Sequence, residues 1–227
     1  MKTNQEYKNA ALDRLRGNWK PAVLATLIYF LICAVVVGVQ EGPVLTQLGA
    51  ASMTEPDLSI LLGFGGTSVL LTLFVLYPLN VGYDNATRLL YERRDYNVTG
   101  NMAGIATHGY GHKVLGMFLY YLKVFLWTLL FFIPGIVMSF AYAMTPYILE
   151  EHPEISAWEA SSRSRMMMKG HKFDLFYMYL SFIGWALLAI LTAGIGFLWL
   201  VPYVEATKAA FYNDLKVECG EIVAGAE

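Results

Sequence analysis

The chain has little charge and almost no cysteine. Asp, Glu, Lys and Arg make up 15% of its 227 residues, and only two cysteines are present. Cys33 lies in an apolar run and Cys219 in a polar tail, so we expect two free thiols rather than a disulfide. The formal net charge of -2 does not suggest the basic surface of a nucleic-acid-binding protein. In contrast, 56% of the residues are hydrophobic and the mean hydropathy is +0.46, which indicates a membrane protein.

Four apolar runs are long enough to cross a membrane at least once. Runs 21–39 and 58–83 contain no charged residue and suit single spans of a hydrocarbon core about 30 Å thick. Runs 114–149 and 175–204 would be about 54 Å and 45 Å long as single helices. Helix breakers lie near their middles, at Pro134-Gly135 and at 192–196. A kink and a hairpin are both allowed at these points.

The basic residues favour hairpins over kinks. Of 16 lysines and arginines, all except Lys123 lie outside the apolar runs, and none lies between Gln40 and Leu62. Cytoplasmic loops are rich in Lys and Arg, so the basic connector 150–174 should lie on the same side as the basic N-terminus. Both long runs must then turn back. We predict an all-α membrane bundle of six transmembrane helices in three hairpins, with both termini cytoplasmic. The chain 1–227 forms one integral-membrane domain with spans of about 21–39, 58–83, 114–133, 135–149, 174–192 and 195–212.

Similar short strings precede each predicted hairpin. They occupy 17–20, 111–113 and Gly170-His171-Lys172. We expect the glycine to end a cytoplasmic helix and the basic residue to lie at the level of the lipid headgroups. This similarity suggests three parallel repeats of a helical hairpin.

Short amphipathic helices are expected on the cytoplasmic side. Thr3 with Glu6, and Ser156 with Glu159, have the spacing of a capping box, which predicts helices that lead into spans one and five. The stretch 161–172 combines basic residues with methionines. It suits either an anionic lipid leaflet or a juxtamembrane anchor without lipid specificity.

Lys123 is the one basic residue inside an apolar run. It lies about 15 Å deep if its helix begins near residue 114, and an ionisable residue at that depth is a candidate functional site. Alternatively, the membrane begins near Tyr120 and Tyr121 and Lys123 snorkels to the interface. Glu205 is expected to pair with Lys208 at i, i+3, and it is also the nearest counter-ion in kind for Lys123.

Neither a catalytic residue nor a bound cofactor or metal is expected. The histidines at 108, 112, 152 and 171 lie on the predicted cytoplasmic side, but they do not form an HExxH motif or another recognised ligand pattern. A cytoplasmic site of histidines with Glu150 and Glu151 remains as a hypothesis. The residues of interest for function or packing are Lys123, Glu205, Gly170, His171, Lys172, Pro134 and Gly135.

Several local motifs carry a resemblance to a known family. They are 126–127, 132–136, 142–149, 168–172, 180–185, 202–203 and 209–212, with 15–19 fitting the same pattern. On these residues the stretch 110–215 resembles a bacterial integral-membrane family, domain of unknown function 975. The resemblance implies an all-helical fold and a bacterial cytoplasmic membrane, and it carries over no catalytic or binding residue.

Three functional hypotheses follow from the sequence. The first is a non-enzymatic structural or accessory component that interacts with the bilayer, including anionic lipids, or with other membrane proteins. The second is a transporter or binder of a small or lipid-like substrate, supported by the repeats, the helix breaks and Lys123. The third is a membrane enzyme with the cytoplasmic His/Glu site.

Overall fold

The computed structural model describes residues 2–50, 67–93, 109–130 and 132–220, and within these ranges the regular elements are all helical. This confirms the all-α class. The helices are α1 (Asn4–Leu15), α2 (Trp19–Ala50), η1 (Thr72–Leu76), α4 (Tyr77–Arg93), α6 (Tyr110–Leu130), α7 (Phe132–Ala141), α8 (Thr145–Glu151), α9 (Ala157–Met167), α10 (Lys172–Leu180), α11 (Ile183–Leu191) and α12 (Phe197–Glu218).

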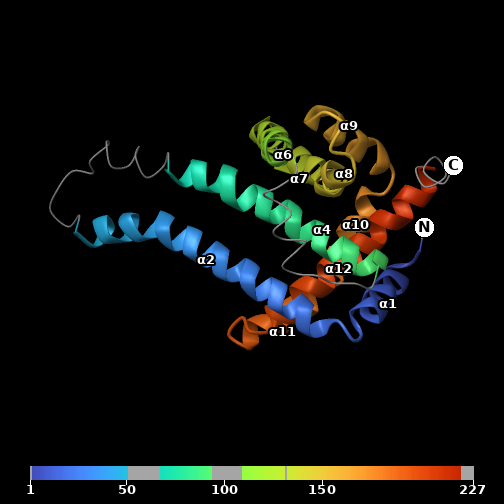
Figure 1. The fold of residues 1–227 in the computed structure, drawn as a ribbon, viewed down its shortest axis with the longest axis horizontal. Coiled ribbons are helices and arrows are strands. Elements are labelled where there is room, and N and C mark those ends of the chain that lie inside the picture. The colour runs from blue at the N-terminus through green and yellow to red at the C-terminus, as the bar shows by residue number, and fades with distance from the viewer. Residues whose placement is uncertain (1, 51–66, 94–108, 131, 221–227) are drawn as a thin grey trace.

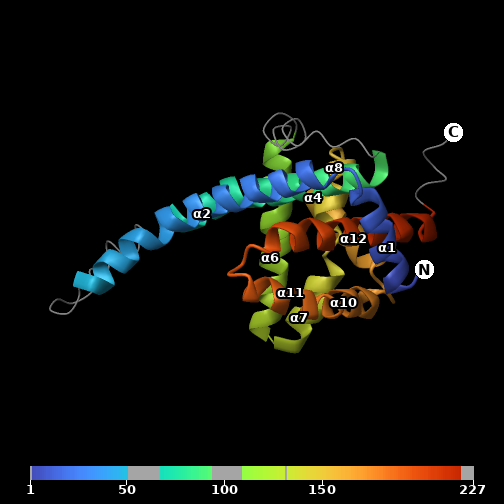
Figure 2. The same ribbon diagram turned by 90° about the horizontal axis from the view of Figure 1, so that it is seen from below.

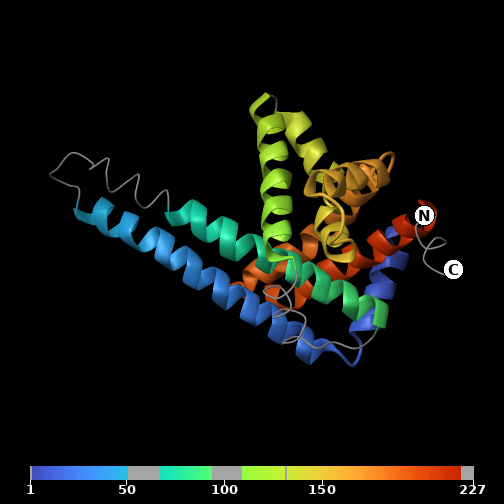
Figure 3. The ribbon, with the colours of Figure 1, turned by 45° about the horizontal axis from the view of Figure 1, so that its top comes forward.

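The helices do not form one parallel bundle. Helices α2 and α4 lie side by side in a long arm that points away from the rest of the molecule (Figure 1). Helices α6 and α7 form a second, antiparallel pair that rises steeply from this arm (Figure 3). Helix α12 runs close to α4, and α1 and α11 pack against it (Figure 2). The core therefore lies where α4, α6, α8 and α12 meet.

Helix α8 is the centre of this core. Its residues from Thr145 to Leu149 are all buried, and the Tyr147 ring stacks on that of Tyr212 of α12 with 4.8 Å between centroids. Helix α1 covers the other side of α12. Its Tyr7, Ala11 and Leu15 are spaced four residues apart on one face and are fully buried, as an amphipathic helix requires.

Three helices of the described ranges are long and apolar enough to cross a membrane, namely Trp19–Val39, Tyr110–Leu130 and Lys172–Leu191. Six complete spans are not supported. Helix α7 has 10 residues, so it is only about 15 Å long, half of the hydrocarbon thickness, whereas the predicted span 174–192 coincides with the candidate span Lys172–Leu191, which comprises α10 and α11. The predicted span 58–83 begins outside the described residues, and its part from residue 67 onward is helical.

Both predicted breaks exist, with small shifts in position. Helix α11 ends at Leu191, a turn follows with Gly194 at a φ of +86°, and α12 begins at Phe197. In the other run, α6 ends at Leu130 and α7 begins at Phe132, and Pro134 belongs to the first turn of α7, where its missing N–H is tolerated. Two further breaks, at 142–144 and 181–182, were not predicted.

The break between α7 and α8 depends on a distant side chain. Ser164 of α9 donates its hydroxyl to the carbonyl of Ala141 at 3.0 Å and accepts the N–H of Met144 at 3.2 Å. These bonds satisfy backbone groups that the interrupted helix leaves open. The chain can therefore turn within the interior and place Pro146 in the first turn of α8.

The predicted helix starts are largely confirmed. Thr3 and Glu6 form the complete capping box of α1, and the Ser156 side chain accepts the N–H of Glu159 at the start of α9. Gly17 and Gly170 have φ values of +85° and +96° immediately before α2 and α10 respectively, as a helix-ending glycine requires. The expectation was wrong for Gly111, which lies inside α6.

Candidate binding cavity

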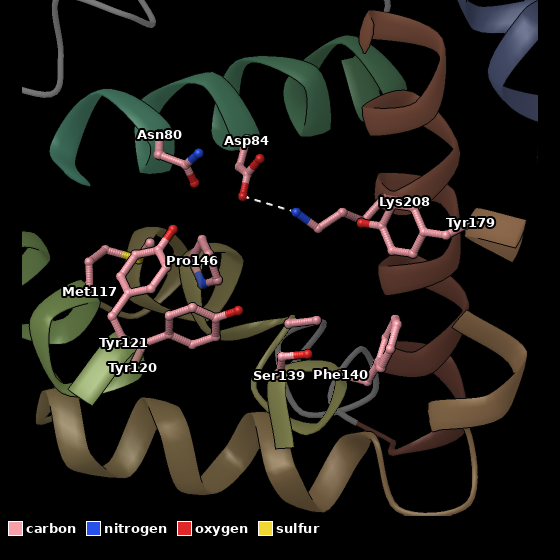
Figure 4. A pocket seen from close by; sticks show the side chains of 11 residues that line it. Asn80, Asp84, Met117, Tyr120, Tyr121, Ser139, Phe140, Pro146, Tyr179 and Lys208 are labelled. Carbon is pink, nitrogen blue, oxygen red and sulfur yellow. Dashed lines mark hydrogen bonds and ion pairs between the residues drawn. The ribbon is translucent and has the colours of Figure 1, made fainter. Parts of the chain in front are cut away.

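A cavity of about 240 Å³ lies between α4, α6, α7, α8, α10 and α12. Figure 4 shows side chains from these helices converging on it. Its lining is polar and aromatic: Asn80, Asp84, Met117, Tyr120, Tyr121, Ser139, Phe140, Ala143, Pro146, Tyr179 and Lys208. A cavity of this size inside a helical bundle has room for several water molecules or a small polar group.

Two charged residues, Asp84 and Lys208, line one end of the cavity, and Glu205 pairs with Lys208 without being part of the cavity lining. Lys208 of α12 donates to Asp84 of α4 at 3.1 Å and to Glu205, one turn earlier on α12, at 3.3 Å. The side chains of Asp84 and Lys208 are 4% and 10% exposed, and they point toward each other (Figure 4). We call Asp84, Glu205 and Lys208 the charged triad. Two carboxylates share one ammonium, so the triad has a net charge of -1 when all three groups are ionised.

Tyrosine rings form much of the cavity wall. Tyr120 and Tyr121 are neighbours on α6, with ring centroids 4.8 Å apart in an edge-to-face arrangement, and Tyr179 comes from α10. Tyr77 stacks on Tyr121 with 4.5 Å between centroids and joins the start of α4 to α6. Aromatic faces carry partial negative charge and attract cations. The cavity therefore combines negative charge with aromatic surface.

A second set of buried charges holds the same helices together. Glu151 of α8 accepts hydrogen bonds from Lys216 and Tyr212 at 2.6 Å each and from Arg88 at 2.5 Å. Glu150 pairs with Lys113 of α6 at 2.7 Å. We call these residues, with Glu92 beside Arg88, the ionic cluster.

Electrostatics within the ionic cluster favour the ionised form of Glu151. Burial raises the pKa of Glu151, but hydrogen bonds from Lys216 and Tyr212 and the charge of Arg88 outweigh burial and hold this pKa below its ordinary value. Lys113, one of the basic residues predicted to lie at headgroup level, is 4% exposed and pairs with Glu150 inside the protein.

Sequence reasoning found the Glu205–Lys208 pair, and the structure confirms it. Asp84 was not predicted as a site residue. It is the first acidic residue after the predicted second span, and a carboxylate at the end of a span is ordinary in a membrane protein. Glu205 is not a counter-ion of Lys123. The ammonium of Lys123 lies 3.8 Å from the ring centroid of Trp158 and 5.5 Å from that of Tyr142, so aromatic faces take the place of a carboxylate.

The other predicted residues lie away from the cavity. Gly170 provides the turn before α10, and Lys172 is the first residue of that helix. His171 bridges two carboxylates, with Nδ1 3.3 Å from Asp174 and Nε2 3.2 Å from Glu218, and joins α10 to the end of α12. These residues connect helices and do not contribute to the cavity lining.

Pro134 and Gly135 have a packing role. A Cβ atom at Gly135 would lie 2.7 Å from the backbone Cα of Thr128 in α6, too close for any side chain. The glycine therefore allows the close approach of α6 and α7.

The described histidines, at 112, 152 and 171, do not form a common site. His152 pairs with Glu154 at 3.1 Å, and the Nε2 atom of His112 is buried without a hydrogen-bond partner in the described part of the chain. His108 lies outside the described residues. Among the described residues, three or more His, Cys, Asp or Glu side chains suited to a metal ion do not come together.

The match to a known family covers half of the chain. Residues 103–218 match the family described as protein of unknown function (DUF975). The chain belongs to this family. The matched part contains α6 to α12 and therefore Lys208, Glu205 and the tyrosines of the cavity, whereas Asp84 lies outside it. No curated protein and no solved structure matches the chain.

Proposed function

We propose that this DUF975 protein is a non-enzymatic integral protein of a bacterial cytoplasmic membrane that binds a small or lipid-like molecule in the cavity beside the charged triad. The observation that carries the proposal is the cavity itself. Its wall brings polar and aromatic groups from six helices to one space. Concave sites where polar and aromatic side chains converge are where proteins usually bind small molecules.

The apolar exterior supports insertion into a bilayer. Large apolar side chains are exposed along the candidate spans, with Leu31 57%, Phe125 60% and Leu191 81% exposed. Surfaces of this kind are costly in water and suited to lipid. The short helix α7 then enters the membrane as the partner of α6, and α10 with α11 crosses it beside α12, in an arrangement with fewer than six complete crossings.

Contact between the chain ends supports a topology with both termini on one side. The Tyr7 hydroxyl of α1 donates to Asp214 near the end of α12 at 2.6 Å, and the backbone N–H of Lys2 donates to the same carboxylate. The basic residues of both ends then favour the cytoplasmic side.

The outer face of α9 fits an anionic leaflet as the partner surface. Trp158 and Met166 are each 65% exposed, and Arg165 of the same helix and Lys169 in the turn that follows it are exposed as well. Neither basic residue has a carboxylate within ion-pair distance among the described residues. Aromatic and basic side chains on one side of a short helix are typical of helices that lie at a membrane surface.

The polar groups of the cavity support binding rather than catalysis. The charged triad is paired within itself, and the hydroxyl of Ser139 donates to the carbonyl of Ile136 at 2.7 Å, so that it is not aligned with a base. An acid–base or nucleophilic mechanism needs such an alignment.

Native mass spectrometry of protein extracted in native lipid discs tests the proposal. The variant Ser139→Trp fills the cavity, and Val137→Trp, on the exposed side of the same helix, is the matched control. We expect the wild type and Val137→Trp to retain a small molecule and Ser139→Trp to lose it. Equal retention by all three would refute a ligand in this cavity. Retention of a membrane protein but no small molecule would favour the accessory role instead.

A further inference from the structure

A long apolar groove adjoins the polar cavity. It has a volume of about 550 Å³ and runs between η1 and α6, lined by Ser68, Val69, Thr72, Leu73, Tyr77, Phe118, Tyr121, Leu122, Val124 and Phe125. Tyr121 belongs to the walls of both spaces. The Tyr77–Tyr121 stack therefore stands where the groove meets the cavity.

The helix beside the groove is irregular. Residues Thr72–Leu76 form a π-helical turn, immediately before α4 brings Asn80 and Asp84 to the cavity. Such turns occur frequently at functional sites, because the extra residue re-aims the side chains that follow.

The charged triad and the ionic cluster differ in net charge. In the ionic cluster, Arg88, Lys113 and Lys216 balance Glu92, Glu150 and Glu151. In the charged triad one ammonium faces two carboxylates, and in the described part of the chain Lys208 is the sole basic side chain within ion-pair distance of either. A positive group in the cavity would restore neutrality.

We infer that the ligand is an amphiphile with a cationic ammonium head, which lies beside Asp84 among the tyrosines, and an alkyl chain that follows the apolar groove. The triad supplies the opposite charge, and Tyr120, Tyr121 and Tyr179 supply aromatic faces for the ammonium. The groove supplies an apolar surface for the chain. This inference rests on the proposed function and specifies the class of ligand.

Three compounds with the same chain test the inference. Decyltrimethylammonium, decanoate and decanol are titrated onto the full-length protein in discs of neutral lipid, and binding is measured by calorimetry. We expect decyltrimethylammonium to bind at least about tenfold more tightly than the other two, the size of one favourable charge or cation–π interaction.

Variants of the triad test the cause of the selectivity. Asp84→Asn and Glu205→Gln each bring the net charge to zero while leaving Lys208 one carboxylate, so each should weaken ammonium binding about tenfold without affecting decanol. Asp174→Asn removes an exposed carboxylate that lies beside His171 and serves as the control. Because the two triad variants alter different helices, misfolding of one leaves the other as a test.

The outcomes separate the inference from the proposed function. If decanoate or decanol binds as tightly as the ammonium compound and Ser139→Trp abolishes that binding, the cavity binds ligands but does not select a cationic head. The inferred ligand class is then refuted, and the proposed function is not. The same conclusion follows if neither triad variant changes the selectivity. If Ser139→Trp binds all three compounds as Val137→Trp does, the cavity is not the site and both proposals fail.

Discussion

Removing the charge of Glu151 should strongly destabilise the fold. This carboxylate is the point at which α4, α8 and α12 meet, since it accepts hydrogen bonds from Arg88, Tyr212 and Lys216. In Glu151→Gln, Arg88 keeps Glu92 as a partner, but Lys216 remains largely buried, at 17% side-chain exposure, without the carboxylate that neutralised it. Breaking a buried pair by removing one partner costs about 3–5 kcal/mol.

The free energy of unfolding in bicelles or mild detergent is the quantity to measure. We expect Glu151→Gln to lose about 3–5 kcal/mol and Lys216→Met to lose less, because Arg88 still balances Glu151. The double variant should be less destabilised than the sum of the two, because the cation that Glu151→Gln leaves unbalanced is then absent. A loss below about 1 kcal/mol in Glu151→Gln, or additive effects, would refute the role of this cluster.

The same residue predicts a dependence of stability on pH. Because the pKa of Glu151 is lowered on folding, its contribution is complete above the pKa of the unfolded chain and disappears as the pH falls through the lower, folded pKa. Wild-type protein should therefore lose stability below about pH 4.5 more steeply than Glu151→Gln does. Parallel pH profiles would contradict this reasoning.

Further predictions concern packing, helix docking and topology. Gly135→Ala should cost about 1–3 kcal/mol of unfolding free energy, since the Cβ would meet the α6 backbone. Tyr7→Phe should lose about 1–2 kcal/mol and speed hydrogen exchange in α1, because the hydroxyl bond to Asp214 is lost. A cysteine at Ser162, in a cysteine-free background, should react with an impermeant reagent only after the cytoplasmic side is opened.

Each of these predictions has a control. Gly111→Ala places its methyl in open space within α6 and should be neutral or slightly stabilising. Tyr177→Phe changes an exposed ring and should leave exchange in α1 unchanged. A cysteine that replaces Ala193, in the turn before α12, should be accessible from the opposite side to Ser162. If the cysteine at position 162 is labelled from outside in intact cells, the proposed topology is wrong.

Local signals in the sequence predicted the local structure well. The capping box of Thr3 and Glu6 depends on two neighbouring side chains, and the turn at 192–196 depends on glycines within it. The pairing of Glu205 with Lys208 follows from helical spacing alone. These features require no knowledge of what packs against them.

Features that depend on distant contacts could not be predicted. The break between α7 and α8 is stabilised by Ser164, about 20 residues further along the chain. Pro146 is a local sign that a helix starts nearby, but the apolar sequence does not show that Ser164 would stabilise a break before it. The burial of Lys113 and Asp84 likewise depends on partners in other helices, because from the sequence each is simply a charged residue beside an apolar run.

The contrast between the ionic cluster and the charged triad argues that the triad is more than a structural pair. A single carboxylate paired with Lys208 is enough to join α4 to α12. In the ionic cluster, the number of carboxylates equals the number of basic side chains. Glu205 adds a second carboxylate to a largely buried site, and uncompensated charge in such a place destabilises a protein. A neutral residue at position 205 would join the helices at lower cost. The surplus carboxylate is explained if the triad meets a cation from outside the chain, and the cavity exposes Asp84 of the triad, together with tyrosine rings, to such a cation.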